Sequence, residues 1–195
     1  KEADEKDQYY TGRQEISNQD YLGQVINYDK EEKLIKFYER NYFEVGDEIE
    51  VFLYKDSKDR LIATTNTPAL ELGKYGVLTV KEVGKIGAFL EWGLEKDLFL
   101  PYKEMTRKVQ PMDEILVSLY IDKSSRLCAT MKGLYDLLRT DSPYQKDDVV
   151  SGRVYEFSDN FGTFLAVDDC FSARIPAHED HSHLRIGDVI EAKVV

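Results

Sequence analysis

The residues with the clearest potential for chemistry are phenylalanines that follow a glycine in two similar segments. The segments are KIGAFLEWG at residues 85–93 and NFGTFLAVD at residues 160–168. An exposed aromatic ring can stack on a nucleic-acid base, and each such contact contributes about 1–3 kcal/mol with little sequence preference. Phosphates then need cations beside the rings, and the chain around the first segment offers Lys81, Lys85, Lys103, Arg107, Lys108 and Arg126.

These rings can do this chemistry only if they face solvent. Side chains alternate across a strand, so Phe89 and Leu90 point to opposite faces, and Leu90 is the natural core member. The alternation therefore predicts that Phe89 and Phe164 face outward. The alternative, that both phenylalanines are core residues, stays open at this point.

A histidine-rich run, HEDHSH at residues 178–183, raises the question of a metal site. Structural zinc sites need closed tetrahedral sets, usually with cysteine, and Cys170 is the only thiol nearby. We therefore predict a solvated loop, with no metal site and no cofactor. The sequence also lacks a phosphate-cradling glycine loop, a nucleophile elbow and a repeated carboxylate cluster. It predicts a binding protein without catalytic residues, not an enzyme.

The charge is distributed unevenly along the chain. The net charge is −11, yet residues 75–138 carry nine basic against nine acidic side chains, whereas residues 139–195 carry six against eleven. This balance argues against tight, nonspecific binding to duplex DNA, which requires a basic face. No apolar run approaches the roughly 18 residues of a membrane span. The charged first residues show no signal peptide, and the two cysteines form no disulfide framework, so we expect a cytoplasmic protein.

Repeated segments indicate the elements that must position these side chains. FLYKDSKDRLIAT (52–64) returns as SLYIDKSSRLCAT (118–130), and the two glycine–phenylalanine segments above are also related by a constant offset. Such self-similarity sets the architecture. In the middle repeat, alternation and turn residues predict five short strands, at 75–83, 88–92, 97–101, 114–120 and 126–130. Five short antiparallel strands of this kind predict a small closed barrel.

The repeats divide the chain into five parts. We predict a polar N-terminal segment (1–20), a shortened first repeat (21–70), a second repeat (71–132), a linker with a short helix (133–146) and a third repeat (147–195). The third repeat is expected to be incomplete, because the sequence stops within its fourth strand.

These motifs resemble those of a known family. The Phe-Gly-small-Phe segments, Gly-Asp-x-Ile before the fourth strand and Asp-x-x-x-Arg in the final turn resemble the ribosomal S1 RNA-binding domain. The tandem arrangement, with LIATT in the first repeat and LFLPYKEM in the second, resembles the bacterial conserved virulence factor B family. The resemblance covers residues 22–195. It implies an all-β chain of tandem five-stranded OB-fold barrels of the S1 type, and it leads us to expect a winged helix beyond Val195.

The resemblance also implies where RNA binds. In this domain class RNA contacts two aromatics, a histidine after the third strand, and the Asp/Arg pair of the final turn. The second repeat offers Ile86 and Phe89 for the aromatics, Pro101 for the histidine, and it retains Asp122 and Arg126. The third repeat keeps both aromatics but has Pro176 for the histidine. With Tyr102 as a compensating aromatic, the expected RNA-binding residues are Lys81, Lys85, Phe89, Tyr102, Arg126, Phe161 and Phe164.

The resemblance therefore implies weak, multivalent binding of single-stranded RNA by a bacterial regulator that acts post-transcriptionally or on virulence-gene expression. A protein–protein interaction scaffold is the alternative, favoured by the acidic flanks and the missing histidine. Exposed rings beside Lys81, Lys85 and Arg126 would favour RNA, whereas buried rings or an acidic surround would favour a protein partner. For the repeated pair, we expect the Asp to stabilise its turn, and both a structural and an RNA-binding role stay open for the Arg.

Overall fold

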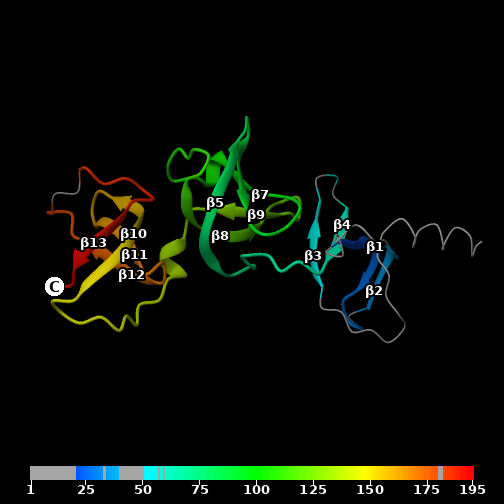
Figure 1. Ribbon diagram of the computed structural model, residues 1–195, viewed down its shortest axis with the longest axis horizontal. Coiled ribbons are helices and arrows are strands. Elements are labelled where there is room, and N and C mark those ends of the chain that lie inside the picture. The colour runs from blue at the N-terminus through cyan, green and yellow to red at the C-terminus, as the bar shows by residue number, and fades with distance from the viewer. Residues whose placement is uncertain (1–20, 33, 40–50, 57, 59, 180–181) are drawn as a thin grey trace, which may run out of the picture. The chain divides into compact units, whose positions relative to one another are not determined.

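The structure is a computed structural model that describes residues 21–32, 34–39, 51–56, 58, 60–179 and 182–195 (Figure 1). Within these residues the regular elements are the strands β1 to β13 and two single-turn 3-10 helices. The chain divides into two compact units, Lys1–Thr67 and Pro68–Val195. The predicted all-β class is confirmed.

The second repeat is a closed barrel. Its elements are β5 (Tyr75–Val83), β6 (Gly87–Glu91), β7 (Leu98–Pro101), the 3-10 helix η1 (Tyr102–Glu104), β8 (Glu114–Ile121) and β9 (Leu127–Thr130). The strands follow one another in the order β5-β6-β7-β9-β8, and β8 pairs with β5 to close the ring. Val80, Leu90, Leu100 and Val117 point inward and are 0% exposed. The predicted five-stranded barrel is therefore confirmed, and alternation of apolar side chains explains its core.

The first unit forms a sheet from β1 (Tyr21–Asp29), β2 (Leu34–Glu39), β3 (Phe52–Lys55) and β4 (Leu61–Thr64). Its order is β2-β1-β4-β3, so β1 pairs directly with β4. In the second repeat the corresponding first strand, β5, pairs instead with β8. The repeated hairpin is thus present in both units but joins different neighbours. The predicted polar segment 1–20 lies outside the described residues.

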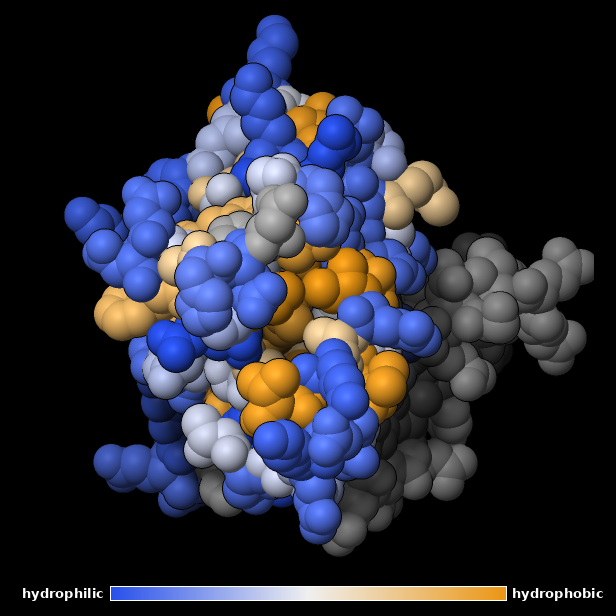
Figure 2. Space-filling view, turned by 90° about the vertical axis from the view of Figure 1, so that its left-hand side faces the viewer, coloured by the Kyte–Doolittle hydropathy of each residue, from blue (hydrophilic) through white to orange (hydrophobic). Residues whose placement is uncertain are grey.

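The third repeat contains β10 (Val149–Ser158), β11 (Gly162–Val167), β12 (Phe171–Ile175) and β13 (Val189–Lys193), in the order β12-β11-β10-β13. In the described part of this repeat, β13 is the last strand. Inward-facing residues of the two outer strands, such as Ala173 and Ile190, consequently stay partly exposed. Figure 2 views this end of the chain and shows apolar surface in the middle of the face, among hydrophilic side chains.

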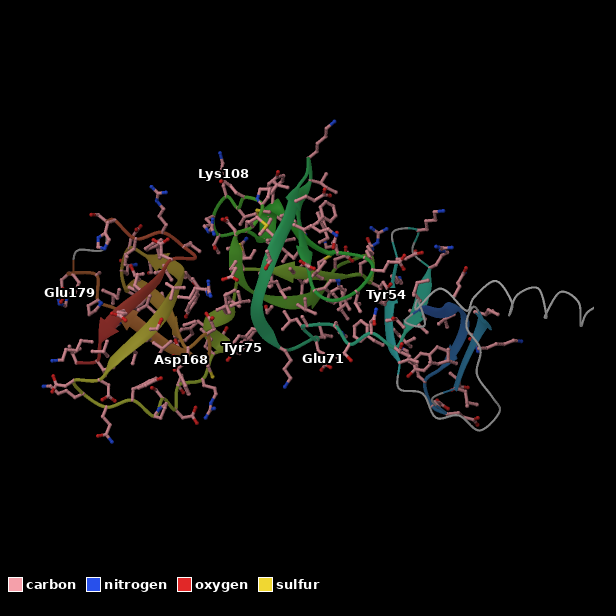
Figure 3. The ribbon with its side chains drawn as sticks, viewed as in Figure 1. Tyr54, Glu71, Tyr75, Lys108, Asp168 and Glu179 are labelled. Carbon is pink, nitrogen blue, oxygen red and sulfur yellow. The ribbon has the colours of Figure 1, made fainter. Side chains whose placement is uncertain are left out.

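The second and third repeats meet in one apolar cluster, which we call the junction cluster. It consists of Leu116 from β8, Leu134 and Leu138 from the linker, and Tyr155 and Ala166 from the third repeat, with Tyr75, Val77 and Phe164 packed against it. The linker contains the 3-10 helix η2 (Leu134–Asp136), where the sequence predicts a short helix. Tyr75 lies at this junction (Figure 3) and donates a hydrogen bond from its hydroxyl to the Cys170 carbonyl at 3.2 Å. The predicted boundary at 133–146 therefore falls inside one compact unit.

Candidate nucleic-acid interface

The outer surface of β6 and β7 carries a pair of aromatic rings. Ala88 and Leu90 point into the barrel, as do Leu98 and Leu100, so the residues between them point outward. Phe89 and Phe99 are partners in the strand register, and their ring centroids lie 5.4 Å apart at an angle of 38°. Both side chains are partly exposed. Phe89 therefore lies on the outer face, as the alternation predicts.

Tyr102 extends this surface towards the turn between β5 and β6. Its side chain is 49% exposed, and its hydroxyl donates a hydrogen bond to the Gly84 carbonyl at 2.6 Å. Ile86 in the same turn is 66% exposed. We call Ile86, Phe89, Phe99 and Tyr102 the aromatic face. Rings of this kind offer flat apolar surface on which bases can stack.

A glycine makes this arrangement possible. A Cβ atom on Gly87 would lie 2.2 Å from the Leu100 carbonyl oxygen and 2.8 Å from the Phe99 ring. Only glycine lets β6 and β7 approach this closely with the Phe99 ring across them. Gly162 has the same role in the third repeat, where a Cβ atom would lie 2.1 Å from the Ile175 carbonyl oxygen. The glycine of the repeated segments is thus a packing requirement.

The charges around the aromatic face are mixed. Lys85 is exposed in the turn, but Lys81 forms a 3.0 Å ion pair with Asp97. The hydrogen bond and charge of Asp97 raise the pKa of Lys81, and the nearby Glu91 and Glu82 act in the same direction. Glu82 is also the register partner of Phe89, so it lies on the same side of the sheet. The Lys81 ammonium group is therefore already paired with the Asp97 carboxylate, whereas the Lys85 side chain is exposed to solvent and accessible to a ligand.

The repeated Asp-x-x-x-Arg segment closes its turn in the same way in both copies. Oδ1 of Asp56 accepts hydrogen bonds from the backbone N–H of Lys58 and Arg60, at 2.8 and 3.0 Å. Oδ1 of Asp122 accepts from the N–H of Ser124 and Arg126, at 2.8 and 2.9 Å. These are the hydrogen bonds that the predicted turn-stabilising role of the Asp requires. In the first copy the Arg60 guanidinium also pairs with Asp56 at 2.6 Å.

Replacing Asp56 by alanine is expected to lower the free energy of unfolding by about 1 kcal/mol, because the turn loses its hydrogen-bond acceptor. Partial burial raises the pKa of Asp56, but hydrogen bonds from Arg60 and Lys58 and the Arg60 charge outweigh it, and the pKa is lowered. This contribution is therefore present above the unfolded pKa of about 3.9 and is lost as the pH falls through the folded pKa. Calorimetry of wild type and variant should converge at acidic pH. Identical curves at pH 7 would show that the turn does not need the carboxylate.

The third repeat places its two predicted aromatics in different surroundings. Phe161 lies in the turn before β11 and is 57% exposed. Phe164 packs against Tyr135 and Tyr155, with ring centroids 5.7 and 6.1 Å away, and so belongs to the junction. These two residues do not form an open surface comparable with the aromatic face of the second repeat.

Phe99 is a residue of the aromatic face that the sequence reasoning did not include. Its signal is nevertheless visible in DLFLP (97–101), because the outward position lies between two leucines that fill the barrel. By contrast, Arg126 is only partly exposed, and its side chain starts at the end of the turn described above. The structure thus brings Phe89, Phe99, Tyr102 and Lys85 to one side of the second repeat.

The described residues contain no group of three or more His, Cys, Asp or Glu side chains that could hold a metal ion. His178 is exposed, and part of the histidine-rich run, residues 180–181, lies outside the described residues. None of the helices that the structure describes is long and apolar enough to cross a membrane.

A closed five-stranded barrel with outward aromatics on its second and third strands defines the class of this protein. The S1 domain family matches residues 25–66 and 72–132, more than half of the chain, and the chain belongs to this family. This confirms the family prediction drawn from the repeated segments.

The chain is also similar to curated proteins that share one name. Conserved virulence factor B of Staphylococcus epidermidis is 23% identical over 167 residues, which cover 80% of this chain and 55% of the relative. The protein of the same name from Staphylococcus aureus is 23% identical over 162 residues, covering 78% of this chain and 53% of the relative. The chain thus spans about half the length of the curated relatives that it matches.

A solved structure has the same fold. It is described as a multidomain protein with nucleic acid binding domains from Streptococcus pneumoniae. The TM-score is 0.58 at 21% sequence identity, and the match covers 89% of this chain and 67% of that one. The fold of the chain is therefore shared with a solved protein.

Proposed function

We propose that this chain binds single-stranded RNA through the aromatic face of its second repeat. The observation that carries the proposal is the outward pair of Phe89 and Phe99, which lie 5.4 Å apart beside an exposed tyrosine and an exposed lysine. Stacking rings suit unpaired bases, since every base has a π face, whereas bases inside a duplex are already stacked. Membership of the S1 domain family and the description of the solved neighbour support this choice.

A wider role is proposed from the name of the relatives. Because the matched proteins are named Conserved virulence factor B, we propose a bacterial regulator that acts on RNA in the cytoplasm. Binding without catalysis is the simplest use of an aromatic face that lies beside exposed lysines such as Lys85 and Lys103. Weak modules linked in one chain gain affinity through their effective concentration, which favours long RNA over short RNA.

A protein-binding scaffold is the second candidate, and a specific observation favours it. Glu82 lies beside Phe89, and Lys81 is paired with Asp97, so the aromatic face has acidic neighbours. An acidic border repels phosphates but would attract a basic peptide. The two candidates therefore differ in the charge of the ligand that they require.

A titration with single-stranded RNA at several salt concentrations tests the proposal. We expect weak binding whose logarithm falls with the logarithm of salt by about 0.7 per phosphate contact, hence a total slope of about −1.4 to −2 for two or three contacts. Duplex DNA of the same length should bind more weakly. Affinity that is independent of salt, or equal affinity for duplex DNA, would contradict RNA binding through the aromatic face. Binding of a basic peptide but not RNA would support the scaffold.

A further inference from the structure

The outer surface of β11 in the third repeat is more covered than the corresponding surface of β6: Phe89 and Phe164 are both partly exposed, but the next outward residue is exposed in β6 (Glu91) and buried in β11 (Ala166). Thr163 and Leu165 face the barrel interior, so Phe164 and Ala166 face outward. Ala166 is nevertheless 0% exposed, because the junction cluster lies over it. We propose that this surface is a docking site for the linker and the second repeat, and that the second and third repeats unfold as one cooperative unit.

Apolar contacts from three parts of the chain support this inference. The linker contributes Leu134 and Leu138, which are 0% and 5% exposed, and β8 contributes Leu116, which is 3% exposed. Leu116 alternates with the inward residues Ile115 and Val117, so it lies on the outside of its own barrel. An outward leucine of one barrel that is almost fully buried must be covered by something else. Here the third repeat and the linker cover it.

Polar side chains also make contacts between the second and third repeats. Arg153 of β10 is only 9% exposed, and its guanidinium lies 2.7 Å from Asp169 in its own repeat and 3.8 Å from Glu114 in the second. Separation of the repeats would leave the Arg153–Asp169 pair intact and remove only the longer contact with Glu114, so this ion pair adds little to the apolar contacts across the junction. Arg107 of the second repeat also approaches Gly187, where a Cβ atom would lie 2.8 Å from its Nη2.

The linker also hydrogen-bonds to the edge of the third sheet. The Arg139 N–H donates to the Cys170 carbonyl at 3.0 Å, and the Ser172 N–H donates to the Arg139 carbonyl at 2.8 Å. The Arg139 guanidinium lies 5.1 Å from the centre of the Phe171 ring. A small open sheet is only marginally stable without cover on its apolar face. The linker and the second repeat supply that cover, and this inference does not depend on RNA binding.

The single tryptophan makes the proposal testable. Trp92 lies in the second repeat and is 3% exposed, so its fluorescence reports the unfolding of that barrel. In the full chain, Phe164→Ala and Leu138→Ala should each lower the temperature of the Trp92 transition by about 5 °C or more. Hydrogen exchange of the β11 amides should report the same loss of stability. Phe161→Ala, at an exposed position in the third repeat, is the matched control and should shift the transition by less than about 2 °C.

Independent unfolding of the two repeats would contradict the proposal. If β11 opens earlier in these variants while the Trp92 transition stays where it is in wild type, the repeats unfold independently and the proposal is wrong. The milder substitutions Phe164→Leu and Leu138→Val give the same decision if an alanine variant does not fold. A native Trp92 signal in a chain whose third repeat is already open would also overturn the proposal.

Discussion

Replacing Gly87 by alanine is expected to lower the free energy of unfolding of the second repeat by about 3 kcal/mol, the upper end of the usual cost of overpacking. The added Cβ would lie 2.2 Å from the Leu100 carbonyl oxygen, which belongs to the neighbouring strand. A flexible side chain could move aside, but here the obstacle is the backbone of β7. Relief would require β6 and β7 to separate, and the hydrogen bonds between them would lengthen. Urea unfolding followed by Trp92 fluorescence measures the loss.

Gly76 provides the matched control for this substitution, because it also lies in a strand of the same barrel. A Cβ atom there would meet only the Leu70 side chain, at 3.5 Å, which is ordinary contact. Alanine should therefore be neutral or should stabilise the strand by up to about 1 kcal/mol, since glycine weakens strands. If Gly87→Ala and Gly76→Ala behave alike, β6 and β7 are not as close as the structure places them.

The fold of the second repeat could be predicted because its signals are local. Apolar alternation gave the five strands, and the Asp122 turn follows from the tendency of aspartate to accept hydrogen bonds from its own turn. The outward direction of Phe89 follows from the same alternation. Phe99 could have been found in this way too, because Leu98 and Leu100 define its outward face.

The surroundings of the site could not be predicted, because they depend on residues distant in sequence. Lys81 pairs with Asp97 across 16 positions, which no local pattern indicates. Phe164 has the same local pattern as Phe89 and is likewise partly exposed, yet it packs against Tyr135 of the linker and Tyr155, whereas Phe89 packs against Phe99. Strand pairing in the first unit also could not be predicted from local sequence. Its hairpin of β3 and β4 repeats the sequence of β8 and β9, yet β1 pairs with β4, whereas the corresponding β5 pairs with β8.

Replacing both Phe89 and Phe99 by leucine is expected to weaken binding of single-stranded RNA by at least about tenfold. Each base stacked on an aromatic ring contributes about 1–3 kcal/mol, and a factor of ten corresponds to about 1.4 kcal/mol. Leucine keeps an apolar side chain at each position, so the free energy of unfolding should change by less than about 1.5 kcal/mol. The RNA titration and urea unfolding of the same samples separate the two effects.

Phe164→Leu is the control for the single variant Phe89→Leu, because the same substitution is made at the corresponding strand position of the third repeat. Its ring packs against Tyr155 and Tyr135, so RNA affinity should change by less than about twofold. Equal losses in both variants would mean that RNA reaches the third repeat by displacing the linker. No loss in the Phe89/Phe99 variant would exclude stacking on the aromatic face and favour a protein ligand there. Phe89 and Phe164 follow the glycine at the same spacing, so a difference between their single leucine variants would reflect the surroundings of each ring: Phe99 and Lys85 beside Phe89, and Tyr135 and Tyr155 beside Phe164.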